Sequence, residues 1–200
     1  MKTILPYCLL FLSLLLNLGL CGLLCVCRRR YGNLLLKSRT DELTGLLNRF
    51  ACMEEINIEL GGHKNPQEQC KAFFLIDLDN FKHINDTYGH GTGDDVLVLL
   101  SCCMQKLFPH HAVLGRWGGD EFLVFLDPAD GQKQVEEKAA MLCRALDQAV
   151  RDRNHPFCVT ISIGIVLARP GEDFSAMMQR ADKALYYVKN HGKSNFCIDV

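Results

Sequence analysis

The sequence has no marked excess of one charge, no C-x-x-C pair and no internal repeat. Its 22 lysines and arginines against 23 aspartates and glutamates leave a formal net charge of −1, which gives no argument for nucleic acid as a partner. The eleven cysteines lack the spacing of a zinc site or a disulfide framework, and free cysteine behaves as a small apolar side chain. A length of 200 residues suits one domain with a short appendage.

Charge is absent from one long stretch, because residues 4–26 contain no acidic or basic side chain. A helix of this length spans roughly 34 Å, enough to cross a bilayer core of about 30 Å. Three arginines follow at positions 28–30, whereas Lys2 is the only charge in front of the stretch. The positive-inside rule therefore predicts that the rest of the chain lies in the cytoplasm.

Two alternatives to a retained anchor remain open. A cleaved signal peptide also has a basic start and an apolar run, although this run is long and no A-x-A-like site precedes the arginines. A lipoprotein signal ending at Cys21 is the other alternative, but Leu20 is bulky for that cleavage point. We predict a transmembrane anchor at residues 1–27, a cytoplasmic linker at 28–40 and one domain at 41–200.

Apolar residues in this domain repeat at helical and at strand periods. Spacings of three and four predict helices around residues 135–149 and 177–188. Strand-like runs occupy residues 72–78, 112–117, 121–126 and 158–167. The first run is apolar on both alternating faces, so we expect it at the centre of a sheet covered on both sides. Strands interleaved with helices, plus one hairpin, predict an α/β fold or α+β sandwich with a mixed sheet.

The stretch RWGGDEF at residues 116–122 places two carboxylates directly after two glycines. Gly118 and Gly119 predict a tight hairpin turn, since glycine tolerates positive φ. If the strand that ends near Asp77 lies beside this hairpin, Asp77 and Asp120 face each other across about 5 Å. Converging acids form an oxygen site suited to Mg²⁺. Alternatively, Asp77 caps a turn and the adjacent acids are solvated, and the spacing alone does not separate these readings.

Several motifs together resemble the GGDEF family of diguanylate cyclases. They are DELTGLLNR at residues 41–49, DLDNFKHINDTYGHGTGD at 77–94, RWGGDEF at 116–122, VTISIGI at 159–165 and ADKALYYVKNHGKSN at 181–195. They occur in the family's order and extend over nearly the whole predicted domain. The resemblance implies a GGDEF fold, similar to polymerase palms and class III nucleotide cyclases, with a central mixed β-sheet flanked by helices.

The resemblance also implies a reaction in which two GTP give cyclic di-GMP and two pyrophosphates. Two subunits each hold one GTP, and each ribose 3′-OH attacks the α-phosphate of the other nucleotide. By match to the family, the metal ligands are Asp77, the Leu78 carbonyl, Asp120 and Glu121. Asp120 is the expected proton acceptor, and Glu121 is the second catalytic acid. Two Mg²⁺ ions, or Mn²⁺, are the implied cofactors, which lower the pKa of the attacking hydroxyl and neutralise the triphosphate.

Other matched positions concern the nucleotide itself. Asn85 and Asp94 match the residues that read guanine, and His90 matches a substrate contact. A carboxylate accepts from N1–H and the exocyclic amine of guanine but meets a lone pair at N1 of adenine, so Asp94 is expected to reject ATP. By residue type alone, Asn85 and Asp94 would instead be caps in a glycine-rich loop. Without a Cβ, Gly118 and Gly119 allow a nucleotide to lie against the backbone.

Three lysines match phosphate positions of the family. Lys82 matches a catalytic lysine near the phosphates, and Lys189 and Lys193 match the pair that holds the terminal phosphate. The second residue of that pair is more often arginine, and lysine keeps the charge without the bidentate fork. Lys189 also suits the C-terminal dipole of a helix that ends near Gly192.

The resulting hypothesis is a Mg²⁺-dependent diguanylate cyclase of the bacterial inner membrane, acting on GTP as a homodimer and not on nucleic acid. One alternative is a degenerate GTP-binding sensor or scaffold without turnover, which the intact acidic motif disfavours. Another is a different cyclic dinucleotide as product, which Asp94 disfavours. Pro109 and Ala112 stand where the family's R-x-x-D product site has its arginine and aspartate. We therefore expect no product inhibition through that site.

Overall fold

The computed structural model describes residues 20–22, 39–62, 70–129 and 131–199. The chain divides into two compact units, residues 1–39 and 40–200. Within the described ranges, no helix is long and apolar enough to cross a membrane. The predicted anchor and linker lie almost wholly outside the described residues, so both stay predictions.

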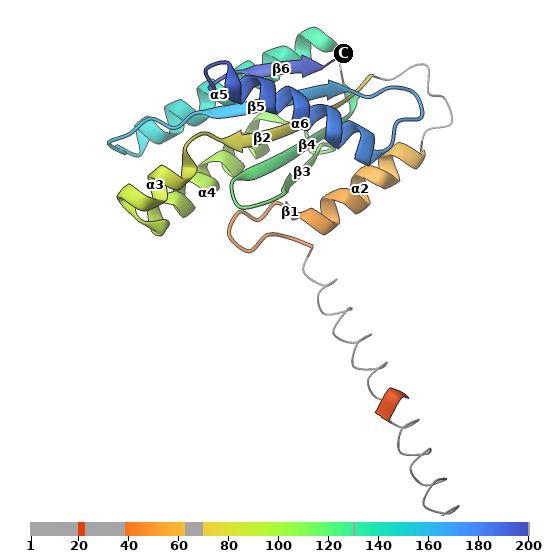
Figure 1. Cartoon of the computed structure of the whole chain (residues 1–200), viewed down its shortest axis with the longest axis horizontal. Coiled ribbons are helices and arrows are strands. Elements are labelled where there is room, and N and C mark those ends of the chain that lie inside the picture. The colour runs from red at the N-terminus through yellow and green to blue at the C-terminus, as the bar shows by residue number, and fades with distance from the viewer. Residues whose placement is uncertain (1–19, 23–38, 63–69, 130, 200) are drawn as a thin grey trace, which may run out of the picture. The chain divides into compact units, whose positions relative to one another are not determined.

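A six-stranded mixed sheet forms the centre of the second unit, as Figure 1 shows. In spatial order its strands are β1 (Leu47–Asn48), β3 (Val113–Arg116), β4 (Glu121–Ala129), β2 (Cys70–Leu78), β5 (Ile161–Leu167) and β6 (Phe196–Asp199). β2 pairs antiparallel with both β4 and β5, whereas the outer pairs β1–β3 and β5–β6 are parallel. The predicted central position of the β2 strand is therefore confirmed.

Helices cover both faces of this sheet (Figure 1). They are α2 (Arg49–Gly62), α3 (Phe81–Tyr88), α4 (His90–Leu107), α5 (Gln132–Asp152) and α6 (Phe174–Asn190). Phe74 and Ile76 pack with residues of α4 and α5, whereas Phe73 and Leu75 pack with residues of α2 and α6. Successive residues of a strand point to opposite faces, so a strand with helices on both sides needs an apolar side chain at nearly every position.

Gly164, in the middle of β5, allows α6 to lie close against the sheet. A Cβ at this position would be 2.1 Å from the Ala181 carbonyl oxygen and 2.5 Å from the Leu185 nitrogen. Backbone atoms cannot yield as a flexible side chain can, so only glycine fits without moving the helix. The close contact holds α6 over the central strands, and the last turn of α6 carries Lys189.

The structure differs from the sequence-based expectation in the segment between β2 and β3. Helices α3 and α4, which the apolar periods did not predict, occupy most of this segment. Asn85 and Asp94 are therefore helical residues, and the alternative that makes them caps in a glycine-rich loop is wrong. Gly89, with φ of 86°, separates the two helices. The strand expected over residues 158–167 begins only at Ile161. The edge strands β1 and β6 have 2 and 4 residues. They are too short for the alternation of apolar and polar residues to be recognised in the sequence.

Candidate functional site

The acids of the two main motifs meet where β2 ends and β4 begins. In the β2–β4 ladder Asp77 lies directly opposite Glu121, and the Leu78 N–H donates to the Asp120 carbonyl at 3.2 Å. Directly opposite residues of an antiparallel pair point to the same face. Asp77 and Glu121 therefore share a face, and Asp120 lies one residue further, in the turn. The predicted neighbourhood of β2 and the hairpin is confirmed, but the residue across from Asp77 is Glu121 and not Asp120.

These carboxylates lie close enough to perturb one another. Only 7% of the Asp77 surface is exposed. Burial raises the pKa of Asp77 above its ordinary value, the contact with Lys189 opposes this, and the charges of Asp120 and Asp79 add to it. The pKa of Glu121 is also raised, first by burial and then by Asp77 and Asp120. A cation bound among these groups would relieve the repulsion.

The donor atoms present fit a magnesium site in which the protein supplies some of the ligands and a substrate would supply others. Among the residues that the structure describes, no three acidic, histidine or cysteine side chains form a ready-made metal site. A positive group is already present, since Nζ of Lys189 lies 2.8 Å from Oδ2 of Asp77. Carboxylate and carbonyl oxygens are preferred by Mg²⁺, which normally completes its shell with phosphate and water oxygens. Asp77, the Leu78 carbonyl, Asp120 and Glu121 are therefore suitable but incomplete ligands.

The predicted hairpin at Gly118 and Gly119 is confirmed, because β3 and β4 pair antiparallel on either side of them. Neither glycine has a positive φ, so the hairpin forms without the left-handed conformation that was given as its reason. A Cβ on Gly118 would lie 2.9 Å from Oε2 of Glu121, whereas no atom lies within 4 Å of a Cβ on Gly119. Gly118 thus leaves space for an acid of the site, and Gly119 presents bare backbone at an open surface.

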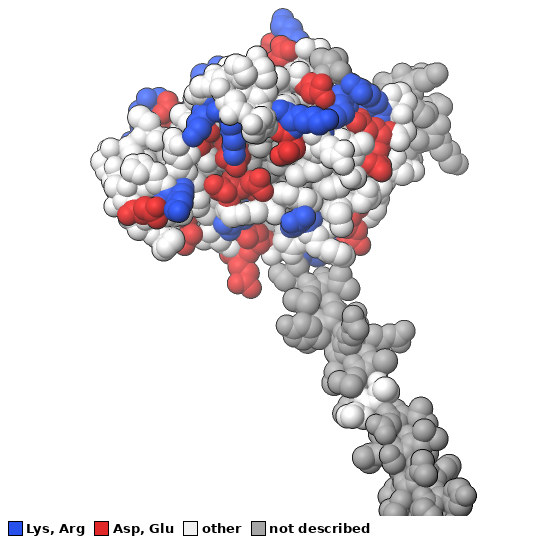
Figure 2. Space-filling view, in the orientation of Figure 1, with Lys and Arg blue, Asp and Glu red and all other residues white. Residues whose placement is uncertain are grey.

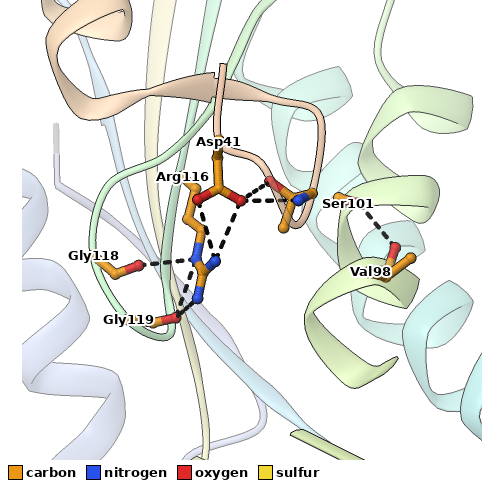
Figure 3. Close-up of polar contacts among 7 residues, drawn as sticks. Asp41, Val98, Ser101, Arg116, Gly118 and Gly119 are labelled. Atoms are coloured by element: carbon orange, nitrogen blue, oxygen red, sulfur yellow. Dashed lines mark hydrogen bonds and ion pairs between the residues drawn. The ribbon is translucent and has the colours of Figure 1, made fainter. Parts of the chain in front are cut away.

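Arg116 connects this turn to the first motif of the domain. Figure 3 shows its guanidinium between the Asp41 carboxylate and the turn. Nη1 lies 3.2 Å from each carboxylate oxygen of Asp41. Nη2 donates to the Gly119 carbonyl at 2.7 Å, and Nε donates to the Gly118 carbonyl at 3.2 Å. Thr44 donates its N–H and its hydroxyl to the same carboxylate. The sequence patterns assigned no role to Asp41 or Arg116, although both stand in quoted motifs.

The residues expected to read the base come together at the α3–α4 corner. A Cβ at Gly93 would be 1.9 Å from Oδ1 of Asn85, so the Asn85 side chain lies against this turn of α4. Oδ1 of Asn85 is buried and accepts no hydrogen bond from the part of the chain that is described. Asp94 follows Gly93 and is exposed, as is His90. His90 and Asp94 are four residues apart on one helix and therefore share a face.

Two of the three lysines reach the end of β2 or the segment that follows it. Lys189 contacts Asp77, and Nζ of Lys193 donates to Oδ1 of Asn80 at 2.8 Å. The structure thus brings this pair together near the acids, although the residues are on different sides of the α6 terminus. Lys82 is exposed in the first turn of α3. Contact of any of these lysines with phosphate stays a prediction.

Asp79 is a buried acid that the sequence patterns did not single out. Only 4% of its surface is exposed. Its carboxylate accepts from the Thr160 hydroxyl at 2.7 Å, the Ser162 hydroxyl at 2.7 Å and the Ser194 N–H at 3.0 Å. The D-L-D spacing offered a signal, because Asp79 lies two residues after Asp77 and alternate residues of an extended chain point to the same side. An isolated buried charge is costly, and here three donors compensate it.

Charged side chains of both signs are intermixed on the face of the molecule that Figure 2 shows. This agrees with the formal net charge of −1. A mixed surface of this kind offers no continuous track for a polyanion on that face.

Comparisons with known sequences find relatives of this chain. The family model described as "Diguanylate cyclase, GGDEF domain" matches residues 38–195. The chain is 33% identical over 161 residues to diguanylate cyclase DgcP from Pseudomonas aeruginosa. This match covers 78% of this chain and 23% of that protein. It is also 35% identical over 172 residues to cyclic di-GMP phosphodiesterase PdeR from Escherichia coli. This match covers 86% of this chain and 25% of that protein. The chain thus spans about a quarter of the length of each of these relatives.

A solved structure shows the same fold. The GGDEF domain of DgcB from Caulobacter crescentus, in complex with c-di-GMP, matches with a TM-score of 0.71 at 28% identity. The match covers 80% of this chain and 95% of that domain. The predicted GGDEF fold, a mixed sheet flanked by helices, is therefore confirmed. With a family model that matches most of its length and a shared fold, the chain belongs to the GGDEF-domain family of diguanylate cyclases.

Proposed function

We propose that this chain condenses two GTP into cyclic di-GMP and two pyrophosphates. One observation carries the proposal: the β2–β4 register places Asp77 and Glu121 on one face, with Asp120 beside them and the Lys189 ammonium at 2.8 Å from Asp77. Acids and a lysine at one point suit a metal–triphosphate complex, in which each group meets the opposite charge. The resemblance to DgcP, a protein named as a diguanylate cyclase, supports the same reaction.

Each group of the site has a role in this reaction. Bound Mg²⁺ would supply Lewis-acid chemistry, lowering the pKa of the attacking 3′-OH and offsetting charge on the phosphates. Asp77, the Leu78 carbonyl, Asp120 and Glu121 are the groups that would hold it. Asp120, in the turn, accepts the proton of the 3′-OH. Lys189 binds phosphate oxygens next to the acids, because its ammonium already lies against Asp77.

The α3–α4 corner selects guanine. The Oδ1 atom of Asn85 is a buried acceptor with no partner among the described groups, and an unsatisfied buried acceptor favours a ligand that donates to it. The exposed Asp94 carboxylate accepts from N1–H and the exocyclic amine. Adenine lacks both donors at these positions, so ATP leaves these acceptors unpaired. His90, on the same face of α4, contacts the bound nucleotide.

The active species is a homodimer. One site holds one GTP, whereas a cyclic dinucleotide requires two 3′-OH attacks on two α-phosphates. The open surface at Gly119 allows a second nucleotide to approach the turn. In dilute protein the initial rate should therefore rise more steeply than linearly with protein concentration, and a strictly linear dependence would contradict a dimeric site.

Residues 1–27 anchor the enzyme in the bacterial inner membrane, with the catalytic domain in the cytoplasm. The uncharged run at residues 4–26 and the three arginines that follow it support this placement. The test is alkaline extraction of bacterial membranes. An integral anchor leaves the full chain in the pellet, and release into the supernatant would overturn the assignment.

The activity test uses the full chain in detergent with GTP and Mg²⁺, and identifies the product by mass spectrometry. Cyclic di-GMP is the expected product, with Mn²⁺ as a substitute for Mg²⁺ and loss of product in excess chelator. Saturable GTP binding with no product would favour a sensor or scaffold. A different cyclic dinucleotide from mixed GTP and ATP would contradict the guanine assignment.

A further inference from the structure

The buried carboxylate of Asp79 joins two segments that lie far apart in the sequence. It follows β2 directly and accepts hydroxyl donors from Thr160 and Ser162, at the start of β5. It also accepts the backbone N–H of Ser194, 115 residues further along the chain. Asp79 is thus one of the points at which the loop after α6, residues 191–195, is attached to the segment that follows the central strand.

This loop has an unfavourable backbone conformation. Lys193 and Ser194 both have positive φ, 61° and 50°, and neither is glycine. Residues with a Cβ rarely adopt this region of φ, so the conformation persists only where surrounding contacts hold the backbone. The contacts here include the hydrogen bond from the Ser194 N–H to Asp79, the one from the Lys193 N–H to the Val188 carbonyl at 3.1 Å, and the one from the Ile163 N–H to the Asn195 carbonyl at 3.0 Å. Without Asp79, the loop loses one of the contacts that stabilise this conformation.

The shape of the loop determines where the Lys193 ammonium lies. Its Nζ donates to Oδ1 of Asn80 at 2.8 Å, and Asn80 directly follows Asp79 in the sequence. A lysine ammonium has three donors, and Lys193 is exposed, so donors remain for an incoming anion. The loop therefore presents a cation beside Asn80, and the hydrogen bond from Ser194 to Asp79 is one of the contacts that hold the loop in this place.

We propose that Asp79 is a positioning residue for the terminal phosphates of the nucleotide, acting through the loop at residues 191–195 and Lys193. This inference rests on the proposed function, because it takes a nucleoside triphosphate as the ligand of Lys193. It adds a role for an acid whose carboxylate accepts three hydrogen bonds from the protein itself.

The experiment measures binding without turnover. The full chain in detergent is titrated with Mg²⁺ and guanosine 5′-(α,β-methylene)triphosphate, whose α–β bond is not cleaved, and in parallel with GMP, which lacks the terminal phosphates. Asp79→Ala should weaken binding of the triphosphate about tenfold, as expected for loss of a charge-assisted contact, and leave GMP binding within about twofold. Lys193→Ala should give the same selective loss. The double variant should bind no more weakly than either single variant, because both changes remove one interaction.

Three further variants separate positioning from general stability. Asp79→Asn keeps an acceptor for the Ser194 N–H and should restore most of the triphosphate affinity. Thr160→Val removes one hydroxyl donor at nearly constant volume, so it remains usable if Asp79→Ala does not fold, and it should give a smaller but still selective loss. Asp127→Ala is the matched control. This second acid has 2% of its side chain exposed, pairs with Lys71 at 2.8 Å and lies six residues along β4 from Glu121, roughly 20 Å away. It should lower the unfolding temperature without changing the ratio of triphosphate to GMP affinity.

Equal loss of triphosphate and GMP affinity in Asp79→Ala, or additive losses in the double variant, would overturn the inference. The outcome is independent of product formation. A selective, non-additive loss in a protein that makes no cyclic di-GMP would contradict only the proposed function. Normal product formation with additive losses would contradict only the role of Asp79.

Discussion

Replacing Arg116 with lysine should loosen the hairpin turn while keeping its positive charge. The guanidinium reaches both oxygens of Asp41 and the carbonyls of Gly118 and Gly119 at the same time. An ammonium is a point donor and cannot span these acceptors. The two side chains are only 17% and 23% exposed, so water replaces the lost bonds poorly. Loss of about two charge-assisted hydrogen bonds, partly offset by those that lysine keeps, should cost about 2 kcal/mol.

Thermal unfolding followed by circular dichroism measures this cost. For a domain of this size about 2 kcal/mol corresponds to a fall in Tm of about 4–8 °C. Cyclic di-GMP formation at saturating GTP should fall as well, because the turn carries Asp120. The matched control is Arg151→Lys on α5, whose ion pair with Asp147 is more exposed, at 58% and 32%, and should change stability by less than about 0.5 kcal/mol. Equal unfolding temperatures for Arg116→Lys and Arg151→Lys would refute the reasoning.

The same variant has a pH signature through Asp41. Burial raises the pKa of Asp41, but the hydrogen bonds from Thr44 and the charge of Arg116 outweigh it, so the folded pKa lies below the ordinary value of 3.8. A depressed carboxyl pKa gives stability that is present above the unfolded pKa and is lost as the pH falls through the folded pKa. The stability difference between wild type and Arg116→Lys should therefore be constant near neutrality and shrink below about pH 4. A difference that grows on acidification would contradict the assignment of Asp41 as the partner.

Three further predictions concern the catalytic site. Asp120→Ala should abolish cyclic di-GMP formation with little change in Tm, because Asp120 lies in a turn and not in the core; undiminished product, measured by mass spectrometry, would rule out its role. Asp94→Ala should mainly relax base choice, seen as a smaller ratio of GTP to ATP turnover, and an unchanged ratio would leave Asp94 without that role. Cyclic di-GMP should not inhibit initial pyrophosphate release, because Pro109 and Ala112 supply no clamp and, among the residues that the structure describes, no arginine or acid lines the adjacent pocket of about 380 Å³. Strong inhibition at low micromolar product, non-competitive with GTP, would show that another product site exists.

The parts of the fold that were predictable are those with a strong local pattern. The buried run in β2 and the periods of α5 and α6 appear directly in the apolar spacing, and the structure confirms all three. No helix was predicted for the α3–α4 segment, since its glycines and polar residues are typical of turns. Of these glycines only Gly89 breaks the helix, whereas Gly93 lies inside α4, where it makes room for Asn85. Local composition does not distinguish a glycine that ends a helix from one that leaves space for a neighbour.

The candidate site was predictable in its residue types but not in its contacts. The motifs named Asp77, Asp120 and Glu121, yet only the register of β2 against β4 determines that Glu121 faces Asp77. Register depends on the packing of both strands along their whole length, which no single motif contains. Asp79 escaped notice for a related reason, because its three donors come from two segments more than 80 residues away. A buried acid becomes interpretable only when its donors are known, and here they lead to the loop that carries Lys193.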